Sequence, residues 1–247
     1  MPDHPRMSLV ALASRWALGM GLISWRYLWS TTPLHRTEER VDEPGLPPPL
    51  PGQLTRQGLQ PWQSGVGPMF HRLFRVRIED AGKDAAGLMH TVIHDMGSLV
   101  PPEVVHVHEG SASDRRLRPG DEIVVDMPGP WNGPVRVVAA EPAQLRLATL
   151  AGHLEAGQIE FRAYDDPPHL VFEIEAWARP ATRAVHLLYS HLRLAKEIQL
   201  NMWVRFCLAA AEEAGGQPHG GVEIRTTVAP LPDPERTEPR EGVEQHA

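Results

Sequence analysis

The chain has 247 residues, a net charge of -7 and one cysteine, Cys207. The charge argues against a nucleic-acid partner, because general nucleic-acid binders carry a basic patch or stripe. A single cysteine excludes a disulfide framework within the chain and suits the cytoplasm. A core of about 150 residues buries enough surface to fold without a metal, so no cofactor is expected.

The first predicted element is an apolar, tryptophan-rich helix within residues 1–35. Residues 8–30 read SLVALASRWALGMGLISWRYLWS. Arg15 and Arg26 leave only ten residues between them, too few to cross a membrane.

Two interpretations of this helix stay open. It packs on the rest of the protein or on a second subunit, or it lies in a membrane interface, where tryptophan is favoured and arginine reaches the headgroups. The second interpretation places the protein at the inner face of a membrane. The residues that would contact lipid are Trp16, Trp25 and Trp29.

Proline-rich stretches flank the predicted domain. Residues 36–65, which include Pro47, Pro48 and Pro49, are interpreted as a linker. Residues 216–247 are acidic and rich in proline, and we expect a disordered tail there. Such stretches cannot bury enough apolar surface to offset the entropy of ordering them.

The domain begins with a period-two pattern from Phe70 to Glu79, in which Arg72 is counted among the polar positions. Helical spacing of apolar residues follows at 83–97. Short strands separated by turn residues are then predicted at 104–109, 121–127, 134–140, 145–150, 158–164 and 170–178. Connections this short favour antiparallel neighbours.

The last predicted element is a long helix at 181–214, a segment without proline or glycine and with a wide apolar face. A helix of this length is best buried by a sheet that curls around it. The sequence therefore predicts an α+β domain at 66–215. It is a curved antiparallel sheet of about seven strands wrapped around a long C-terminal helix, with the N-terminal helix separate.

Four local motifs follow one another in this domain: RPGDE at 118–122, GPWNGP at 129–134, TLAGHLEAG at 149–157 and FEIEAWARP at 172–180. Their order and spacing resemble an uncharacterised bacterial and plant domain-of-unknown-function family within the START-like (SRPBCC, helix-grip) superfamily. The resemblance implies a cavity between sheet and helix, which relatives use for lipids, hormones or polyketide-like molecules. It implies no established catalytic set.

The leading hypothesis is a noncatalytic module that binds a hydrophobic small molecule or a lipid-like ligand in this cavity. His153 is expected at the cavity mouth, where a few polar groups orient an apolar ligand. The full set of candidate ligand contacts is His153, Glu155, Trp131, Phe74, Val125, Phe161, Phe172, Ile174, Tyr189, Gln199 and Trp203.

Two alternatives remain. The first is a cyclase- or hydrolase-type enzyme in the same cavity, with His153 and Glu155 as acid–base groups. The second is a protein–protein interaction module with a filled core, whose contacts come from the N-terminal helix and the tail.

Charged residues on the strands also have two interpretations. Glu160, Arg162, Glu173 and Glu175 share one alternation. They are either paired carboxylates for acid–base chemistry or a solvent face paired across strands with Arg162, Arg136 and Arg146.

Two histidine pairs could bind zinc if each found a third ligand. His90 and His94 lie one helical turn apart, and His106 and His108 lie on one face of a strand. With 13 histidines in the chain such spacings arise by coincidence, so no metal is expected. Cys207, inside a helical pattern, is expected to be a buried structural thiol.

Overall fold

The computed structural model describes residues 33–43, 45–52, 58–100, 106–109, 116–126, 132–185 and 193–231. The predicted helix at residues 8–30 lies outside these ranges, as do its three tryptophans.

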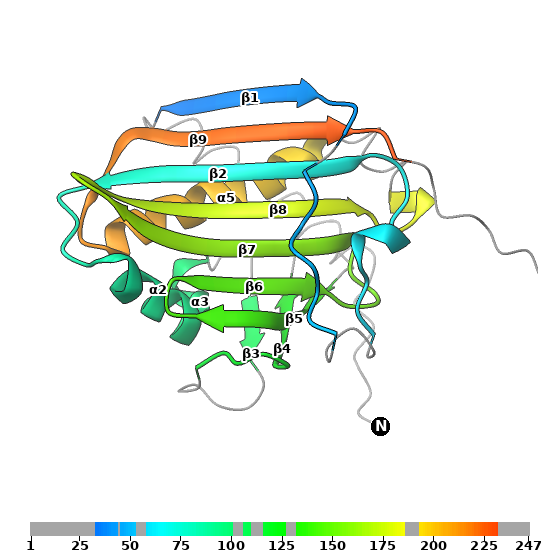
Figure 1. Ribbon diagram of the computed structural model, residues 1–247, viewed down its shortest axis with the longest axis horizontal. Coiled ribbons are helices and arrows are strands. Elements are labelled where there is room, and N and C mark those ends of the chain that lie inside the picture. Colours follow the sequence, from blue (N-terminus) through cyan, green and yellow to red (C-terminus); the bar gives the residue numbers. More distant parts are fainter. Residues whose placement is uncertain are drawn as a thin grey trace, which may run out of the picture.

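Nine strands in the described part of the chain form one sheet, in the order β1-β9-β2-β8-β7-β6-β5-β4-β3 (Figure 1). All neighbours are antiparallel except β1 and β9, which are parallel. The strands are β1 (Leu34–Arg40), β2 (Met69–Glu79), β3 (His106–Glu109), β4 (Glu122–Asp126), β5 (Asn132–Glu141), β6 (Gln144–Thr149), β7 (Glu155–Asp166), β8 (His169–Pro180) and β9 (Gln217–Ala229). The predicted antiparallel run from the third strand to the eighth is confirmed.

The helices named in the described ranges are α2 (Ala85–His94), α3 (Met96–Leu99) and α5 (Arg193–Glu213), with one 3-10 turn, η1 (Trp62–Ser64). The carboxylate of Asp84 begins α2 by accepting a hydrogen bond from the backbone N–H of Gly87 at 2.8 Å. Gly215 follows α5 with φ 74°, a left-handed conformation that glycine adopts without steric cost. The chain turns there and enters β9.

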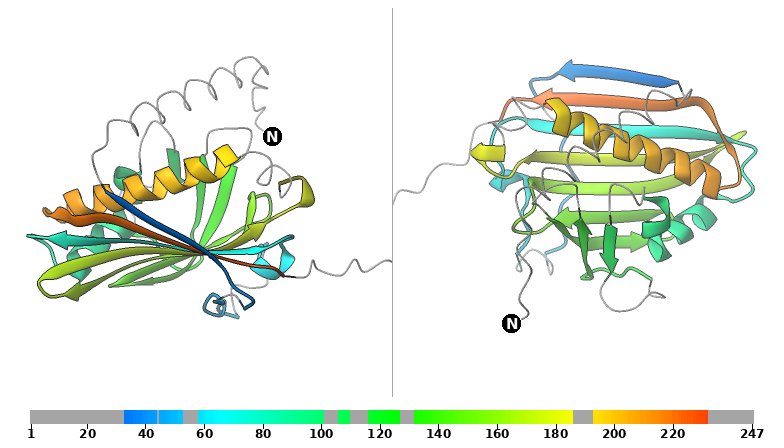
Figure 2. Two further views of the ribbon diagram at one scale, coloured as in Figure 1. Left: turned by 90° about the horizontal axis from the view of Figure 1, so that it is seen from above. Right: turned by 180° about the vertical axis from the view of Figure 1, so that it is seen from behind.

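Helix α5 lies across one face of the sheet, which we call the inner face (Figure 2). The alternation of apolar residues puts Phe74, Phe161 and Ile174 on this face, and the register places Phe74 and Phe161 on either side of Ile174. All three belong to one buried cluster that includes Phe206 of α5. The predicted α+β class, with a C-terminal helix packed on a largely antiparallel sheet, is confirmed.

The prediction of a disordered tail is wrong for residues 217–229, which form β9. This strand lies between β1 and β2, and it is paired with β2 from Met69 to Glu79. Val222, Ile224 and Ala229 are buried. The period-two pattern was therefore present in this segment, but the neighbouring prolines masked it.

The prediction of a free linker at 36–65 is also wrong in part. Residues 34–40 form β1, an edge strand with no apolar alternation, so two strands exceed the predicted count of about seven. The chain then crosses the face of the sheet opposite α5, which we call the outer face (Figure 1). There Gln158 of β7 donates a hydrogen bond to the carbonyl of Pro48 at 3.2 Å.

Helix α5 begins at Arg193 in the described residues, so it covers the later part of the helix predicted at 181–214. None of the helices in the described ranges is long and apolar enough to cross a membrane.

Candidate functional site

Aromatic side chains pack between the inner face and the C-terminal half of α5. The Phe161 ring centroid lies 5.7 Å from that of Trp203 and 5.3 Å from that of Phe206. Phe172 stacks on Phe206 at 5.9 Å. Among the predicted ligand contacts, four are core residues with at most 1% of their surface exposed: Phe74, Phe161, Phe172 and Ile174. Trp203 is partly buried against the same cluster.

The inner face becomes polar toward the start of β2. Arg72 has the same alternation as Phe74 and is only 3% exposed, so its assignment to the polar side of the strand is wrong. Its Nη1 atom lies 3.7 Å from Oε1 of Glu155, whose side chain is 12% exposed. The guanidinium also lies over the ring of Phe70, 4.9 Å from its centroid. An ion pair with a buried arginine and a largely buried glutamate therefore lies at the end of an apolar face.

Small and polar neighbours surround this ion pair. Ala176 of β8 and Thr226 of β9 are the register partners of Arg72 on its two sides. Thr226 is fully buried, and its hydroxyl oxygen has no hydrogen-bond partner in the described part of the chain. Buried polar groups are normally hydrogen-bonded to protein or ordered water. This end of the inner face thus offers a hydroxyl as well as two charged groups.

The loop before β7 holds Glu155 in place. The backbone N–H of Glu155 donates to Nδ1 of His153 at 2.9 Å, and the side-chain amide of Gln60 donates to the carbonyls of both residues. Burial lowers the pKa of His153, and the charge of Glu155 offsets only part of this effect. His153 is therefore a neutral ring that positions the strand bearing Glu155.

Four predicted ligand contacts cannot be placed in this site. Trp131 and Tyr189 lie outside the described residues. Val125 lies on β4 and Gln199 on α5, but the side chains of both are outside the described part of the structure.

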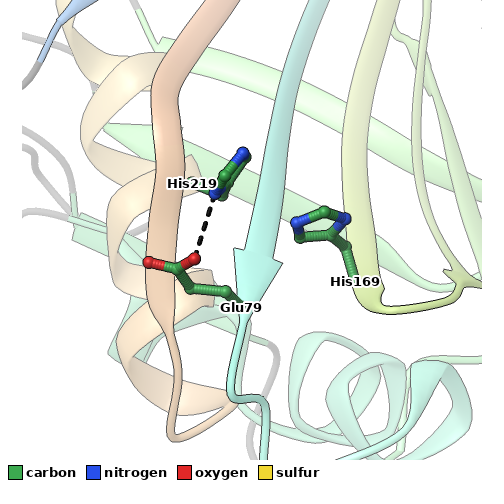
Figure 3. A group of neighbouring side chains, drawn as sticks. All are labelled: Glu79, His169 and His219. Atoms are coloured by element: carbon green, nitrogen blue, oxygen red, sulfur yellow. Dashed lines mark hydrogen bonds and ion pairs between the residues drawn. The ribbon is translucent and has the colours of Figure 1, made fainter.

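The described histidines form one of the predicted pairs and one group that the sequence did not predict. His90 and His94 stack at 3.9 Å on α2, and Nδ1 of His94 bonds to the carbonyl of His90. A different group, Glu79, His169 and His219, gathers metal-ligating atoms within 4.8 Å of one another (Figure 3). Among the described residues, no other such group of three is found. The other predicted pair, His106 and His108, lies on β3, but these side chains are outside the described part of the structure.

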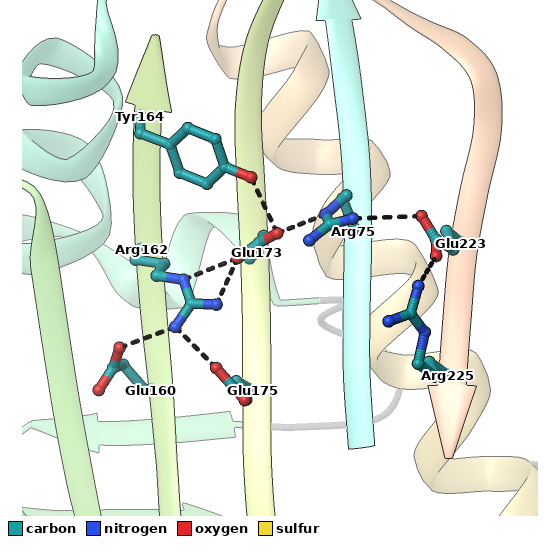
Figure 4. Close-up of polar contacts among 8 residues, drawn as sticks. All are labelled: Arg75, Glu160, Arg162, Tyr164, Glu173, Glu175, Glu223 and Arg225. Carbon is teal, nitrogen blue, oxygen red and sulfur yellow. Dashed lines mark hydrogen bonds and ion pairs between the residues drawn. The ribbon is translucent and has the colours of Figure 1, made fainter. Parts of the chain in front are cut away.

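Carboxylates on the outer face are bound in a polar network (Figure 4). Arg162 contacts three of them, and Glu173, only 1% exposed, also contacts Arg75 and Tyr164. Pairing across strands is thus confirmed, but the expected solvent face is partly buried. The residues of this network are Arg75, Glu160, Arg162, Tyr164, Glu173, Glu175, Glu223 and Arg225.

The network favours the charged form of Glu175. Burial on its own would raise the pKa of Glu175, but hydrogen bonds from His71 and Arg162 and their charges lower it. A carboxylate with a lowered pKa is a poor general acid. The expected partner Arg136 instead pairs with Glu122, and Nε of Arg146 has no hydrogen-bond partner in the described residues.

A pocket of about 510 Å³ lies on the outer face, between the proline-rich segment and β7. Small-molecule sites typically have volumes of about 300–1,000 Å³. Gln158, which is 5% exposed, contributes a carbonyl oxygen without a partner in the described part of the chain. The other lining residues are Leu46, Pro47, Pro48, Pro49, Leu50, Leu59, Pro61, Trp62 and Gln63.

Comparison with protein families matches residues 98–208 to the family described as Domain of unknown function (DUF1990). The match covers less than half of the chain, and it includes the four motifs that resemble a domain-of-unknown-function family. A comparison with curated proteins finds no match.

Solved structures with a similar arrangement include the di-domain ARO/CYC protein StfQ from the steffimycin biosynthetic pathway. Its TM-score is 0.43, with 12% identity over 62% of this chain and 54% of that chain, so this chain spans about half its length. The hypothetical protein jhp0584 from Helicobacter pylori has a TM-score of 0.43 and 9% identity, over 70% of this chain and 98% of that one. Major latex-like protein 151 from Panax ginseng has a TM-score of 0.37 and 14% identity, over 61% and 99%. Likenesses at this level say nothing about ligand or activity.

Proposed function

We propose that the protein binds a hydrophobic small molecule or lipid-like ligand between the inner face and the long helix. The observation that carries the proposal is the ion pair of the buried Arg72 and the largely buried Glu155 at the end of the apolar face. A buried ion pair adds little net stability compared with well-packed apolar residues, so stability alone does not account for it. A mostly apolar site with a few convergent polar groups is the usual form of a small-molecule site.

The pair specifies the chemistry of the ligand. Arginine offers a planar set of donors that suits a carboxylate, sulfonate or phosphate, and Glu155 limits how much negative charge the site accepts. The apolar body of the ligand would lie beside Trp203, which is only partly buried, at the border of the cluster that contains Phe74, Phe161, Phe172 and Ile174. In this arrangement His153 acts through its hold on the backbone of Glu155, as a positioning residue.

The first experiment identifies what the protein carries. The full chain, purified under native conditions, is examined by native mass spectrometry beside a solvent extract of the same sample. A bound apolar mass that dissociates on denaturation supports the proposal and identifies the ligand class. A mass that also appears in the solvent extract of a blank without the protein counts as contamination.

A probe titration locates the site. Anilinonaphthalene sulfonate combines an apolar body with an anion, and its fluorescence rises in apolar surroundings. Replacing Arg72 by Gln removes one charge-assisted hydrogen bond and should weaken probe binding by about tenfold. Arg77→Gln is the matched control, because Arg77 is an exposed residue of the same strand. Equal affinity in the two variants would exclude Arg72 from the site.

The folding of each variant is checked by circular dichroism before the titration. Where Arg72→Gln does not fold, Arg72→Lys retains the charge but loses the planar fork of donors, and it should bind the probe with intermediate affinity.

The outer-face pocket is the second place where an apolar ligand would fit. Its volume, its proline and leucine lining and the carbonyl oxygen of Gln158 favour a ligand that donates a hydrogen bond. Trp62→Ala should remove binding at this place and leave binding at the inner face unchanged. The two variants Arg72→Gln and Trp62→Ala therefore decide between the two locations.

Membrane contact is a further part of the proposal. Trp16, Trp25 and Trp29 would hold the protein at a lipid surface, where it would load or release its ligand. Flotation of the full chain with anionic liposomes tests this role, and a chain beginning at residue 33 is the control. Full-length protein that stays at the bottom of the gradient would remove the membrane from the proposal.

A further inference from the structure

We propose that Glu79, His169 and His219 form a Zn²⁺ site on the outer face of the sheet (Figure 3). They lie far apart in the sequence, at the end of β2, the beginning of β8 and the beginning of β9. Because β2 lies between β8 and β9, the strand that carries the glutamate is flanked by the two strands that carry the histidines. One ligand atom from each residue lies within 4.8 Å of the other two.

The contacts among the three side chains support a shared ligand. Nδ1 of His219 lies 3.0 Å from Oε2 of Glu79, and the ring centroids of His169 and His219 are 4.6 Å apart. Two ligands of one tetrahedral zinc ion, each about 2.0–2.1 Å from the metal, are about 3.4 Å apart. The side chains of Glu79 and His219 are 47% and 53% exposed, so both have room to rotate over the remaining distance.

A local irregularity of the sheet lies next to His219. The register between β2 and β9 shifts after Val76, so that Val76 pairs with Val222 and Arg77 pairs with His219. Gly220 and Gly221, which form this bulge, have φ 71° and 89°. Bulges of this kind re-aim side chains and are frequent next to functional sites. Residues with a side chain at both positions would be strained.

The ligand types favour zinc over other divalent ions. Two imidazoles and one carboxylate suit Zn²⁺, whereas Mg²⁺ and Ca²⁺ prefer oxygen ligands alone. Three protein ligands leave a fourth position open for water or for another molecule. Arg77, opposite His219, adds a positive charge nearby, and Asp166, opposite His169, adds a negative one. The charge of Asp166 therefore offsets that of Arg77, and the site can accept a cation.

The test uses the full chain without a histidine tag and ZnCl₂ in isothermal titration calorimetry. The wild-type protein should bind one Zn²⁺ per chain with micromolar affinity. Single variants His169→Ala, His219→Gln and Glu79→Gln each remove one ligand and should weaken binding by at least about tenfold, as even indirect neighbours of a metal contribute this much. His219→Gln retains a polar side chain, which keeps the comparison valid if the alanine variants lose stability.

A double variant, His90→Ala with His94→Ala, is the matched control. These residues form the other described histidine pair, on α2, and their loss should leave zinc affinity unchanged. Thermal unfolding gives a second readout, because an ion that binds only the folded state raises the unfolding temperature. The proposal is overturned if wild-type protein shows no saturable binding, or if the three site variants bind like wild type. Both results can be obtained whether or not the protein binds an apolar ligand at the inner face.

Discussion

Two nitrogen atoms of Arg162 on β7 contact the same carboxylate oxygen of Glu173 on β8. Nε and Nη2 of Arg162 lie 2.7 and 2.6 Å from Oε2 of Glu173. The other carboxylate oxygen contacts Arg75 on β2 and accepts a hydrogen bond from Tyr164 at 3.1 Å. Glu173 thus joins three neighbouring strands while only 1% of its side chain is exposed.

Replacing Glu173 by Gln should destabilise the fold. The change leaves two arginines near each other without their shared carboxylate, and breaking a buried pair typically costs about 3–5 kcal/mol. Urea unfolding followed by circular dichroism measures the loss. Glu223→Gln, at a more exposed position of the same network, should change the unfolding free energy by less than about 1 kcal/mol. Equal effects of the two substitutions would contradict the central role of Glu173.

His153 should make the protein less stable in mild acid. Its pKa is lowered in the folded state, so below about pH 6.5 the unfolded chain binds a proton that the folded chain does not. This contribution to stability is present above that pH and is lost as pH falls toward the folded pKa. His153→Asn keeps an acceptor near Nδ1 and should flatten the dependence of the urea midpoint between about pH 7 and 5. His90→Asn, on an exposed residue, is the control; an unchanged slope in His153→Asn would refute the prediction.

Gly157→Ala should be strongly destabilising. A Cβ at this position would lie 1.9 Å from the backbone oxygen of Trp177, because β7 and β8 approach closely there. Overpacking of this kind typically costs about 1–3 kcal/mol and more where the neighbour is backbone. Gly97→Ala is the matched control, since its Cβ would meet only a side-chain atom at 3.9 Å. Thermal unfolding should separate the two variants, and similar unfolding temperatures would contradict this reasoning.

The C-terminal strand should be essential. A chain that ends at Gly215 lacks β9, which separates β1 from β2, and it exposes one whole edge of β2. Unpaired edges of this length promote aggregation. We expect the truncated chain to be insoluble, while a chain that ends at Leu231 keeps every described strand. Soluble, folded protein ending at Gly215 would show that β9 is dispensable.

Cys207 should be unreactive in the folded protein. Its side chain is fully buried, burial raises the pKa of the thiol, and the charge of Glu173 adds to this effect. Because the thiolate is the reactive form, a thiol reagent should label Cys207 only after unfolding in urea. Rapid labelling under native conditions would indicate local opening of α5.

Local patterns were sufficient for the elements of the core. The alternation around Phe74, Phe161 and Ile174 predicted which side of each strand is buried, because period two is a property of the strand itself. The helical spacing predicted α2 and the later part of the long helix for the same reason. Arg72 is two residues from Phe74, a spacing that predicts the inner face. Because the residue is charged, it was nevertheless assigned to the polar side of the strand.

The sequence by itself therefore determined the α+β class, the antiparallel run of strands and the apolar residues of the inner face. The tertiary structure alone decided that β9 enters the sheet beside β1, that Arg72 meets Glu155, and that Glu79, His169 and His219 come together. Such meetings join segments far apart in the chain. They depend on strand order and register, which no local periodicity encodes.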